Sequence, residues 1–218
     1  MRKIWILWWI WPEASAQFYL KLIEHIKKSW AIISNKDFPQ IIINSVNAPE
    51  IIGFGDDSVD DYILWIEELV IHQVDSIYMI CNTIHAYHQK LVEETWANII
   101  NIRNLVRSFL AWLVDRVTCI LGTENTIKSW LYSFEGINYM NVDDTIQYHI
   151  QNAIMKFNSW KDYSLERWIL QKFIYDNQHC FFVCACTEMR DIIWIEQMIG
   201  VDYLETMDLF IDDIVAKL

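Results

Sequence analysis

Two cysteines in this chain stand where a thiol could take up or release a proton. Cys81 follows the apolar run 77–80, and Cys186 follows the apolar run 181–184. A cysteine thiol has an ordinary pKa of about 8.5, so a protein can tune it into an acid or a base near neutral pH. Two such thiols at one ligand would allow a proton to leave one side and arrive on the other.

Polar residues follow both cysteines. Asn82 and Thr83 come after the first, and Thr187 comes directly after the second. Amide and hydroxyl groups at a strand end can bind an anionic ligand, and the start of a helix there stabilises a thiolate. One cysteine in such a place is more often a small buried apolar residue. The repetition in both halves of the chain favours a chemical role.

Short apolar runs alternate with longer amphipathic stretches along the chain. The apolar runs predict strands at residues 3–10, 40–46, 76–80, 98–102, 116–122 and 180–184. The amphipathic stretches predict helices at residues 12–28, 58–72, 83–95, 103–112, 126–134, 143–158, 163–175, 191–199 and 205–218. This alternation predicts an α/β protein in which helices cover both faces of parallel sheets.

The two halves of the chain repeat the same order of elements. The apolar runs 4–7 and 117–121 open the halves, and each half later leads into one of the two cysteines. We predict two similar Rossmann-like domains related by a pseudo-two-fold axis, one formed by 1–102 with 203–218 and the other by 103–202. Ligands of open α/β sheets bind beyond the carboxyl ends of the strands. The active site is therefore expected in the cleft between the domains.

Four segments resemble the motifs of the aspartate/glutamate racemase family of two-cysteine amino-acid racemases. Residues 81–85, Cys-Asn-Thr-Ile-His, resemble the family's Cys-Asn-Thr-x-His, and residues 185–188, Ala-Cys-Thr-Glu, resemble its Gly-Cys-Thr-Glu. Residues 123–132 resemble Thr-x-x-Thr-x-x-Ser-Gly-x-Tyr, and residues 6–12 resemble Leu-Gly-Gly-Met-Gly-Pro, when the tryptophans there are read as glycine. The resemblance runs in order from one end of the chain to the other.

The resemblance implies racemisation of an amino acid without pyridoxal phosphate or any other cofactor. Cys81 and Cys186 would act on opposite faces of the substrate Cα, one as thiolate and the other as thiol. The resemblance also implies a set of substrate-binding residues: Asn82, Thr83, Thr126, Lys156 and Thr187. On the residues alone, Thr126 could equally be a helix cap and Lys156 an ordinary solvated lysine.

Several alternatives remain for the substrate. Aspartate-specific members of the family carry an arginine after the second strand, whereas residues 44–51 contain none. We therefore expect aspartate, glutamate or a broad range of amino acids. A hydantoin racemase or a maleate isomerase type of enzyme is the nearest enzymatic alternative, and a ligand-binding relative without turnover is the non-catalytic one.

Composition excludes other classes of protein. The net charge of −12 argues against a nucleic-acid partner, because such proteins need clustered lysine and arginine. No apolar run reaches the roughly 20 residues of a membrane span. The five cysteines are odd in number and predict no disulfide framework, so a cytoplasmic location is expected.

The N-terminal residues 1–16 also fit a short signal peptide, which is the less favoured interpretation. The resemblance implies a homodimer.

The remaining cysteines and histidines carry weaker signals. Cys119 and Cys180 are interpreted as core residues, and no spacing predicts a metal site. His85 and His88 follow the first cysteine and could tune it. A buried or surface histidine with an ordinary structural role is the favoured interpretation.

The chain has twelve tryptophans and only five glycines in 218 residues. Trp8, Trp9 and Trp11 crowd a strand-to-helix loop, and others stand where helices are expected to end, which are places that favour glycine. We interpret most or all of the tryptophans as standing for glycine, as if UGA codons that the source reads as glycine had been translated as tryptophan. A protein that is simply rich in tryptophan would leave the shortage of glycine unexplained. Literal tryptophans predict crowding around residues 8–11.

Overall fold

The computed structural model describes residues 3–8, 12–29, 34–46, 59–113 and 115–218. The chain divides into two compact units, each with its own parallel sheet. Unit 1 comprises Met1–Ile102 with Met207–Leu218, and unit 2 comprises Arg103–Thr206. The predicted α/β class with parallel sheets is confirmed. The predicted pseudo-two-fold relation and the cleft stay predictions.

The sheet of unit 1 has three parallel strands in the order β2-β1-β3. The strands are β1 (Lys3–Trp8), β2 (Gln40–Ser45) and β3 (Ser76–Met79). A single parallel bridge between Ile77 and Ile99 extends the sheet beyond β3. The first strand thus lies between the second and the third.

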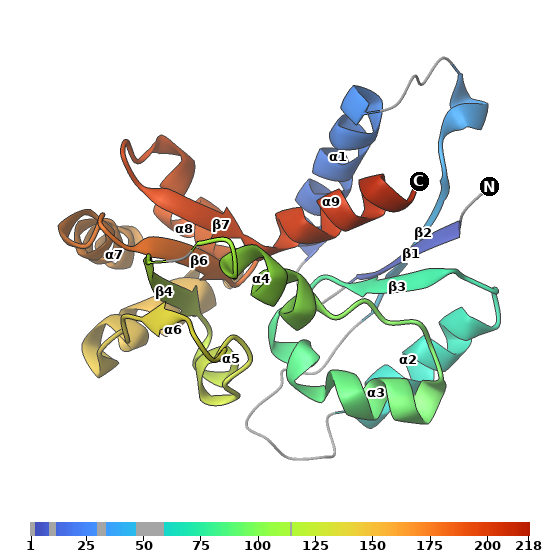
Figure 1. The fold of residues 1–218 in the computed structure, drawn as a ribbon, viewed down its shortest axis with the longest axis horizontal. Coiled ribbons are helices and arrows are strands. Elements are labelled where there is room, and N and C mark those ends of the chain that lie inside the picture. Colours follow the sequence, from blue (N-terminus) through green and yellow to red (C-terminus); the bar gives the residue numbers. More distant parts are fainter. Residues whose placement is uncertain (1–2, 9–11, 30–33, 47–58, 114) are drawn as a thin grey trace. The chain divides into compact units, whose positions relative to one another are not determined.

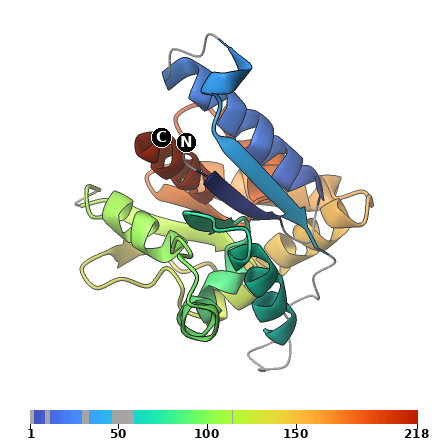
Figure 2. The same ribbon diagram turned by 90° about the vertical axis from the view of Figure 1, so that its right-hand side faces the viewer.

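Helices cover β3 of unit 1 on both faces (Figures 1 and 2). The helices of this unit are α1 (Pro12–Ser29), η1 (Asn35–Asp37), α2 (Asp60–Val70), η3 (Thr83–Tyr87), α3 (His88–Thr95) and α9 (Thr206–Lys217). Ile77 and Met79 pack into the core formed with α2 and α3. Tyr78, which points to the other face, packs against Phe210 of α9 with ring centroids 5.4 Å apart.

The C-terminal helix α9 is fixed to unit 1 by polar contacts as well. Tyr78 donates a hydrogen bond from its hydroxyl to Asp213, with 2.8 Å between the oxygens. Lys21 of α1 forms an ion pair with Asp208. These contacts join the end of the chain to its beginning within one unit.

The sheet of unit 2 has four parallel strands in the order β5-β4-β6-β7. The strands are β4 (Val117–Gly122), β5 (Asn138–Tyr139), β6 (Phe181–Ala185) and β7 (Asp202–Glu205). Again the first strand of the unit lies between its second and third. The bridge at Ile99 in unit 1 occupies the place that β7 occupies here, so the two sheets share one topology.

The helices of unit 2 are α4 (Ile102–Leu110), α5 (Glu124–Lys128), α6 (Asp144–Asn158), α7 (Ser164–Asp176), α8 (Met189–Ile193) and η4 (Ile195–Gln197). Side chains of α6, α7 and α8, among them Ile150, Leu170 and Ile192, form one buried cluster with Phe182 of β6. Every residue of β6 is buried, which explains its continuous apolar sequence. Within the described part of the chain, no helix is long and apolar enough to cross a membrane.

Four predicted elements differ from the structure. The helix expected at 191–199 is divided into α8, which ends at Ile193, and the 3-10 helix η4. The helix expected at 83–95 is divided into η3 and α3. The strand expected at 98–102 is reduced to the single bridge at Ile99, because α4 already begins at Ile102. The helix expected at 126–134 is wrong: α5 starts before this range and ends at Lys128.

The short strands β5 and β7 were not predicted from the sequence. Pairing of β7 with β6 also moves the division between the units. It falls after Thr206, whereas the sequence placed it after residue 202.

Four tryptophans adopt a left-handed backbone, with φ between 52° and 55°: Trp96, Trp130, Trp160 and Trp194. Two of them end the regular helices α3 and α8 as C-caps. Their side chains are exposed, by 91% at Trp96, 74% at Trp130, 85% at Trp160 and 45% at Trp194. Residues in this backbone region that end helices are usually glycines. The crowding predicted around residues 8–11 concerns the side chains of Trp8, Trp9 and Trp11, which lie outside what the structure describes.

Candidate active site

Cys81 lies just past the carboxyl end of β3, in a tight turn. Its backbone N–H donates to the carbonyl of Met79, with 2.9 Å between nitrogen and oxygen. The next turn begins at Asn82, whose carbonyl accepts from the N–H of His85 at 3.0 Å. Cys81 is half-buried and packs against the core of unit 1. The short helix that follows is a 3-10 helix, so the regular helix expected behind this thiol begins only at His88.

The Cys81 thiol interacts electrostatically with the phenol of Tyr62 on α2. Burial raises the pKa of Tyr62 far above its ordinary value, and the neighbouring Cys81 and Asp61 raise it further. The phenol therefore keeps its proton at neutral pH. Cys81 thus borders a neutral side chain that carries an O–H group.

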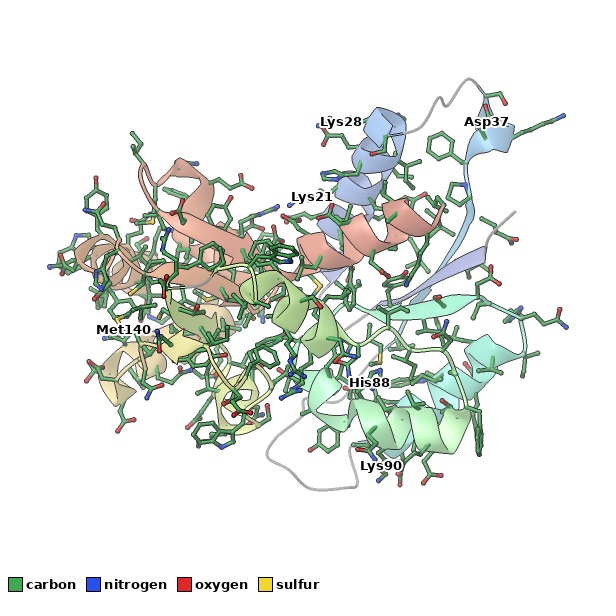
Figure 3. All side chains as sticks on the ribbon, viewed as in Figure 1. Lys21, Lys28, Asp37, His88, Lys90 and Met140 are labelled. Atoms are coloured by element: carbon green, nitrogen blue, oxygen red, sulfur yellow. The ribbon has the colours of Figure 1, made fainter. Side chains whose placement is uncertain are left out.

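The two histidines after Cys81 have structural roles. His85 is buried and donates from Nε2 to the carbonyl of Met79 at 3.1 Å, and burial lowers its pKa to about 3. Its ring is neutral at pH 7 and supplies no positive charge for a thiolate. His88, at the start of α3, donates from Nε2 to the carbonyl of Ile99 at 2.8 Å (Figure 3). Both rings bind backbone carbonyls, which supports the interpretation of these histidines as structural residues.

Cys186 lies directly past the carboxyl end of β6 and is buried, with 8% of the residue exposed. Its Sγ donates a hydrogen bond to Oε2 of Glu188, with 2.7 Å between sulfur and oxygen. Glu188 is itself buried, and its carbonyl accepts from the N–H of Ile192 at 2.9 Å, which fixes it at the start of α8. Sequence reasoning noted Glu188 only as part of a motif and missed this contact.

Thr126 lies beside the strand end that carries Cys186. A Cβ atom built on Gly122 would lie 3.1 Å from the carbonyl oxygen of Ala185 and 3.4 Å from Cγ2 of Thr126. The ends of β4 and β6 and the helix α5 therefore meet so closely that position 122 favours glycine. Thr126 is buried, and its N–H donates to Oγ1 of Thr123 at 3.2 Å. Thr123 is the N-cap of α5, so the alternative that Thr126 is the cap is wrong.

Lys156 lies in an ion pair between α6 and α7. Its Nζ is 2.7 Å from Oε1 of Glu166, and Asn152 donates to the same oxygen at 2.8 Å. The Glu166 side chain is only 3% exposed. Burial raises the pKa of Glu166, but the hydrogen bonds from Lys156 and Asn152 outweigh burial, and the pKa lies below its ordinary value. Lys156 is therefore held in place and is not an ordinary solvated lysine.

Solved structures with this fold include an aspartate racemase, an aspartate racemase homologue and a glutamate racemase. An aspartate racemase from Picrophilus torridus gives a TM-score of 0.81 at 19% identity, over 100% of this chain and 94% of its own. An aspartate racemase homologue from Pyrococcus horikoshii OT3 gives 0.76 at 18%, over 100% and 99%. A glutamate racemase from Francisella tularensis, solved in complex with D-glutamate, gives 0.68 at 16%, over 100% and 81%.

The chain has the fold of the aspartate and glutamate racemases. The sequence itself matches no family model and no curated protein. At these identities the likeness establishes the racemase fold, and the chemistry has to be argued from the residues.

Within this racemase fold, each unit brings part of the predicted site together. In unit 1, Asn82 is buried and Thr83 half-buried directly after Cys81. In unit 2, Thr126 lies beside Gly122, whose strand partner Ala185 precedes Cys186, and Thr187 is half-buried. No contact joins Lys156 to these residues in the described part of unit 2, and its role toward substrate stays a prediction.

The other cysteines lie in the core, as predicted. Cys119 and Cys180 are fully buried, and burial raises the pKa of Cys119 to about 12. Across the described residues, no group of three or more histidine, cysteine, aspartate or glutamate side chains could hold a metal ion.

Proposed function

We propose that the chain is an amino-acid racemase that uses Cys81 and Cys186 as its two bases and needs no cofactor. The observation that carries the proposal is the repeated placement of the two thiols. Each follows the third strand of a parallel sheet whose first strand lies between the second and the third. The racemase fold, matched over the whole chain, supports the same function.

The proposed reaction is a proton exchange at one carbon atom. The thiolate of one cysteine takes the Cα proton, and the electron pair of the broken C–H bond moves into the substrate carboxylate system. The thiol of the other cysteine then gives its proton to the opposite face of Cα. The substrate leaves inverted, the two cysteines have exchanged protonation states, and no oxidant or reductant is consumed.

The carbanionic intermediate needs hydrogen-bond donors in place of a cofactor. We assign this role to polar residues near the two cysteines: Asn82, Thr83, Thr126 and Thr187. Lys156, held by Glu166, is proposed to bind a substrate carboxylate. Residues 44–51 contain no arginine, so the proposed substrates are aspartate, glutamate and a broader range of amino acids.

The five thiols of the chain suit a reducing compartment, and we expect the enzyme to act as a homodimer in the cytoplasm. Light scattering of the purified chain checks the dimer. A monomer that racemises at full rate would remove that part of the proposal.

Chiral chromatography on a panel of substrates tests the function. The purified chain is incubated with single enantiomers of aspartate, glutamate and neutral amino acids, and in parallel with hydantoins and maleate. We expect each accepted amino acid to approach equal amounts of both enantiomers. Turnover of a hydantoin or of maleate alone would assign a different isomerase, and no turnover on any compound would favour the ligand-binding alternative.

A further inference from the structure

Resting on the proposed function, we propose that Glu188 is a positioning residue that keeps the proton on the Cys186 thiol in the substrate-free protein. The observation is the short contact in which Sγ of Cys186 donates to Oε2 of Glu188 at 2.7 Å. Both residues are buried, at 8% and 5% exposure. The contact lies wholly within unit 2.

A carboxylate at this distance acts on a thiol in two ways. It accepts the S–H hydrogen bond, which stabilises the protonated sulfur. It also places a negative charge beside the sulfur, which opposes formation of a second negative charge there. In a buried place this repulsion is weakly screened. Both effects favour the thiol form of Cys186 and make its thiolate a stronger base once formed.

Two arginines on α8 and on the neighbouring helix α7 have other partners. Arg190 of α8 forms ion pairs with three acidic side chains: Asp191, Glu196 and Glu205. Arg167 of α7 donates to a backbone carbonyl of α8 at 2.7 Å. Glu188 is the carboxylate that contacts the Cys186 thiol. Removal of this charge should therefore change the ionisation of Cys186.

A two-base racemase must begin each turnover with one thiolate and one thiol. Because Glu188 keeps Cys186 protonated, Cys81 is the thiolate, and therefore the base, of the resting enzyme. Cys81 borders the neutral phenol of Tyr62, which does not oppose its ionisation. The free enzyme is then ready for the enantiomer whose Cα proton Cys81 removes, and reaction of the other enantiomer first requires the reverse protonation state.

The pH profile of alkylation tests the proposal, because iodoacetamide reacts with the thiolate. Mass spectrometry follows each cysteine of the full chain from pH 6 to pH 11, with no substrate present. In the wild type we expect half-maximal reactivity of Cys186 at a higher pH than that of Cys81. Glu188→Gln should lower the Cys186 midpoint by about one pH unit or more and leave Cys81 unchanged.

Matched variants separate charge from folding. Glu188→Asp keeps the charge and should keep the Cys186 midpoint nearer to wild type. Glu196→Gln removes the same charge from an exposed side chain and should change nothing. Cys119, Cys180 and Cys184 are fully buried and report any unfolding by becoming reactive. An unchanged or raised Cys186 midpoint in a folded Glu188→Gln chain overturns the proposal.

This test does not depend on turnover. A shifted midpoint in a chain that racemises nothing would keep the role of Glu188 and remove the proposed function. Racemisation with an unshifted midpoint would do the reverse.

A second inference rests on the backbone alone. We infer that Trp96, Trp130, Trp160 and Trp194 stand at positions that are glycine in the natural protein. Six non-glycine residues in the described part of the chain have positive φ, and four of them are these tryptophans. Their side chains are exposed, whereas a large apolar residue kept for packing would be buried. The shortage of glycine in the chain points the same way.

The codons of the four tryptophans decide this inference. UGA at all four positions supports it, and UGG at any of them overturns it there. A stability measurement gives an independent readout. Trp194 is left out of it, because its ring also lies 3.6 Å from the guanidinium of Arg167.

Replacing Trp96, Trp130 and Trp160 together by glycine should raise Tm by several degrees, since each change relieves a left-handed backbone. The control is Trp168→Gly, which alters an exposed tryptophan inside α7. Glycine there should lower Tm. A triple variant that melts no higher than the parent chain would contradict the inference.

Discussion

The two thiol sites share one topology and differ in the ionisable side chains that interact with them. Cys81 follows β3 and borders the neutral phenol of Tyr62, whereas Cys186 follows β6 and donates to the carboxylate of Glu188. A repeated fold can place two equivalent thiols, but equivalent thiols would share one protonation state. In the proposed mechanism, this difference in neighbours allows one cysteine to rest as a base and the other as an acid.

The largest expected effect comes from removing either thiol. Cys81→Ser and Cys186→Ser should each lower kcat/KM for racemisation by about 10²- to 10⁴-fold, because a hydroxyl is a far weaker proton donor and base here. Chiral chromatography measures the loss. Cys119→Ala, which changes a buried core thiol, is the control. The folded protein of this variant should keep the kcat/KM of the wild type.

The same variants sharpen the comparison between the sites. Cys186→Ser retains Cys81, so it should still exchange the Cα proton of one enantiomer, and Cys81→Ser should favour the other. Exchange of the same enantiomer by both variants would show that the two thiols do not act on opposite faces.

A smaller effect is expected at the buried ion pair of unit 2. Lys156→Met leaves the Glu166 carboxylate buried without its cation, so the free energy of unfolding should fall by about 3 kcal/mol. Urea denaturation measures the change. If Lys156 also binds the side-chain carboxylate of the substrate, KM for aspartate should rise while KM for alanine, which lacks that group, stays the same.

The double variant Lys156→Met with Glu166→Leu separates the two roles. It should recover most of the lost stability, because no charge remains buried, but the raised KM for aspartate should persist. A KM that recovers together with the stability would make Lys156 a structural residue only.

The third expected effect is a dependence of stability on pH that arises in unit 1. The pKa of His85 is about 3 in the folded chain, below the ordinary value of about 6.5. The unfolded chain therefore binds more protons between these values, and the stability due to His85 is complete above pH 6.5 and lost as pH falls toward 3. Between pH 7 and pH 5 the loss should be about 2 kcal/mol, at roughly 1.4 kcal/mol per pH unit.

Hydrogen exchange at pH 7 and pH 5 locates this loss. Protection should fall in η3 and α9, which pack around His85, and less in α6 and α7 of unit 2. His85→Asn should remove most of the pH dependence from unit 1. Equal losses in both units would assign the effect to general acid destabilisation.

Much of the fold follows from hydrophobic pattern. β6 is continuously apolar because it is buried on both faces, and α6 begins at the capping residue Asp143 that the sequence displays. The strand β7, Asp202–Glu205, mixes charged and apolar residues and runs straight into α9. Only its pairing with β6 makes it a strand, so local sequence does not reveal it.

The candidate site, like the fold, could be predicted only in part from the sequence. The positions of Cys81 and Cys186 follow from the apolar runs before them. The bond between Cys186 and Glu188 does not, since it depends on the side-chain orientation of a residue two positions away. The spacing Cys-x-Glu after a buried strand is the signal that could have suggested it. The end of α5 before Trp130 depends on a backbone conformation that tryptophan rarely adopts.

Deuterium incorporation in heavy water tests the central claim most directly. Each enantiomer of aspartate and glutamate is incubated with the chain, and mass spectrometry reads the label at Cα in product and remaining substrate. Two-base transfer between Cys81 and Cys186 predicts a product enantiomer that carries one solvent deuterium at Cα from the earliest times, with little label in the remaining substrate. Product that retains the substrate's own proton would contradict the two-thiol account, and so would the absence of Cα exchange with every amino acid.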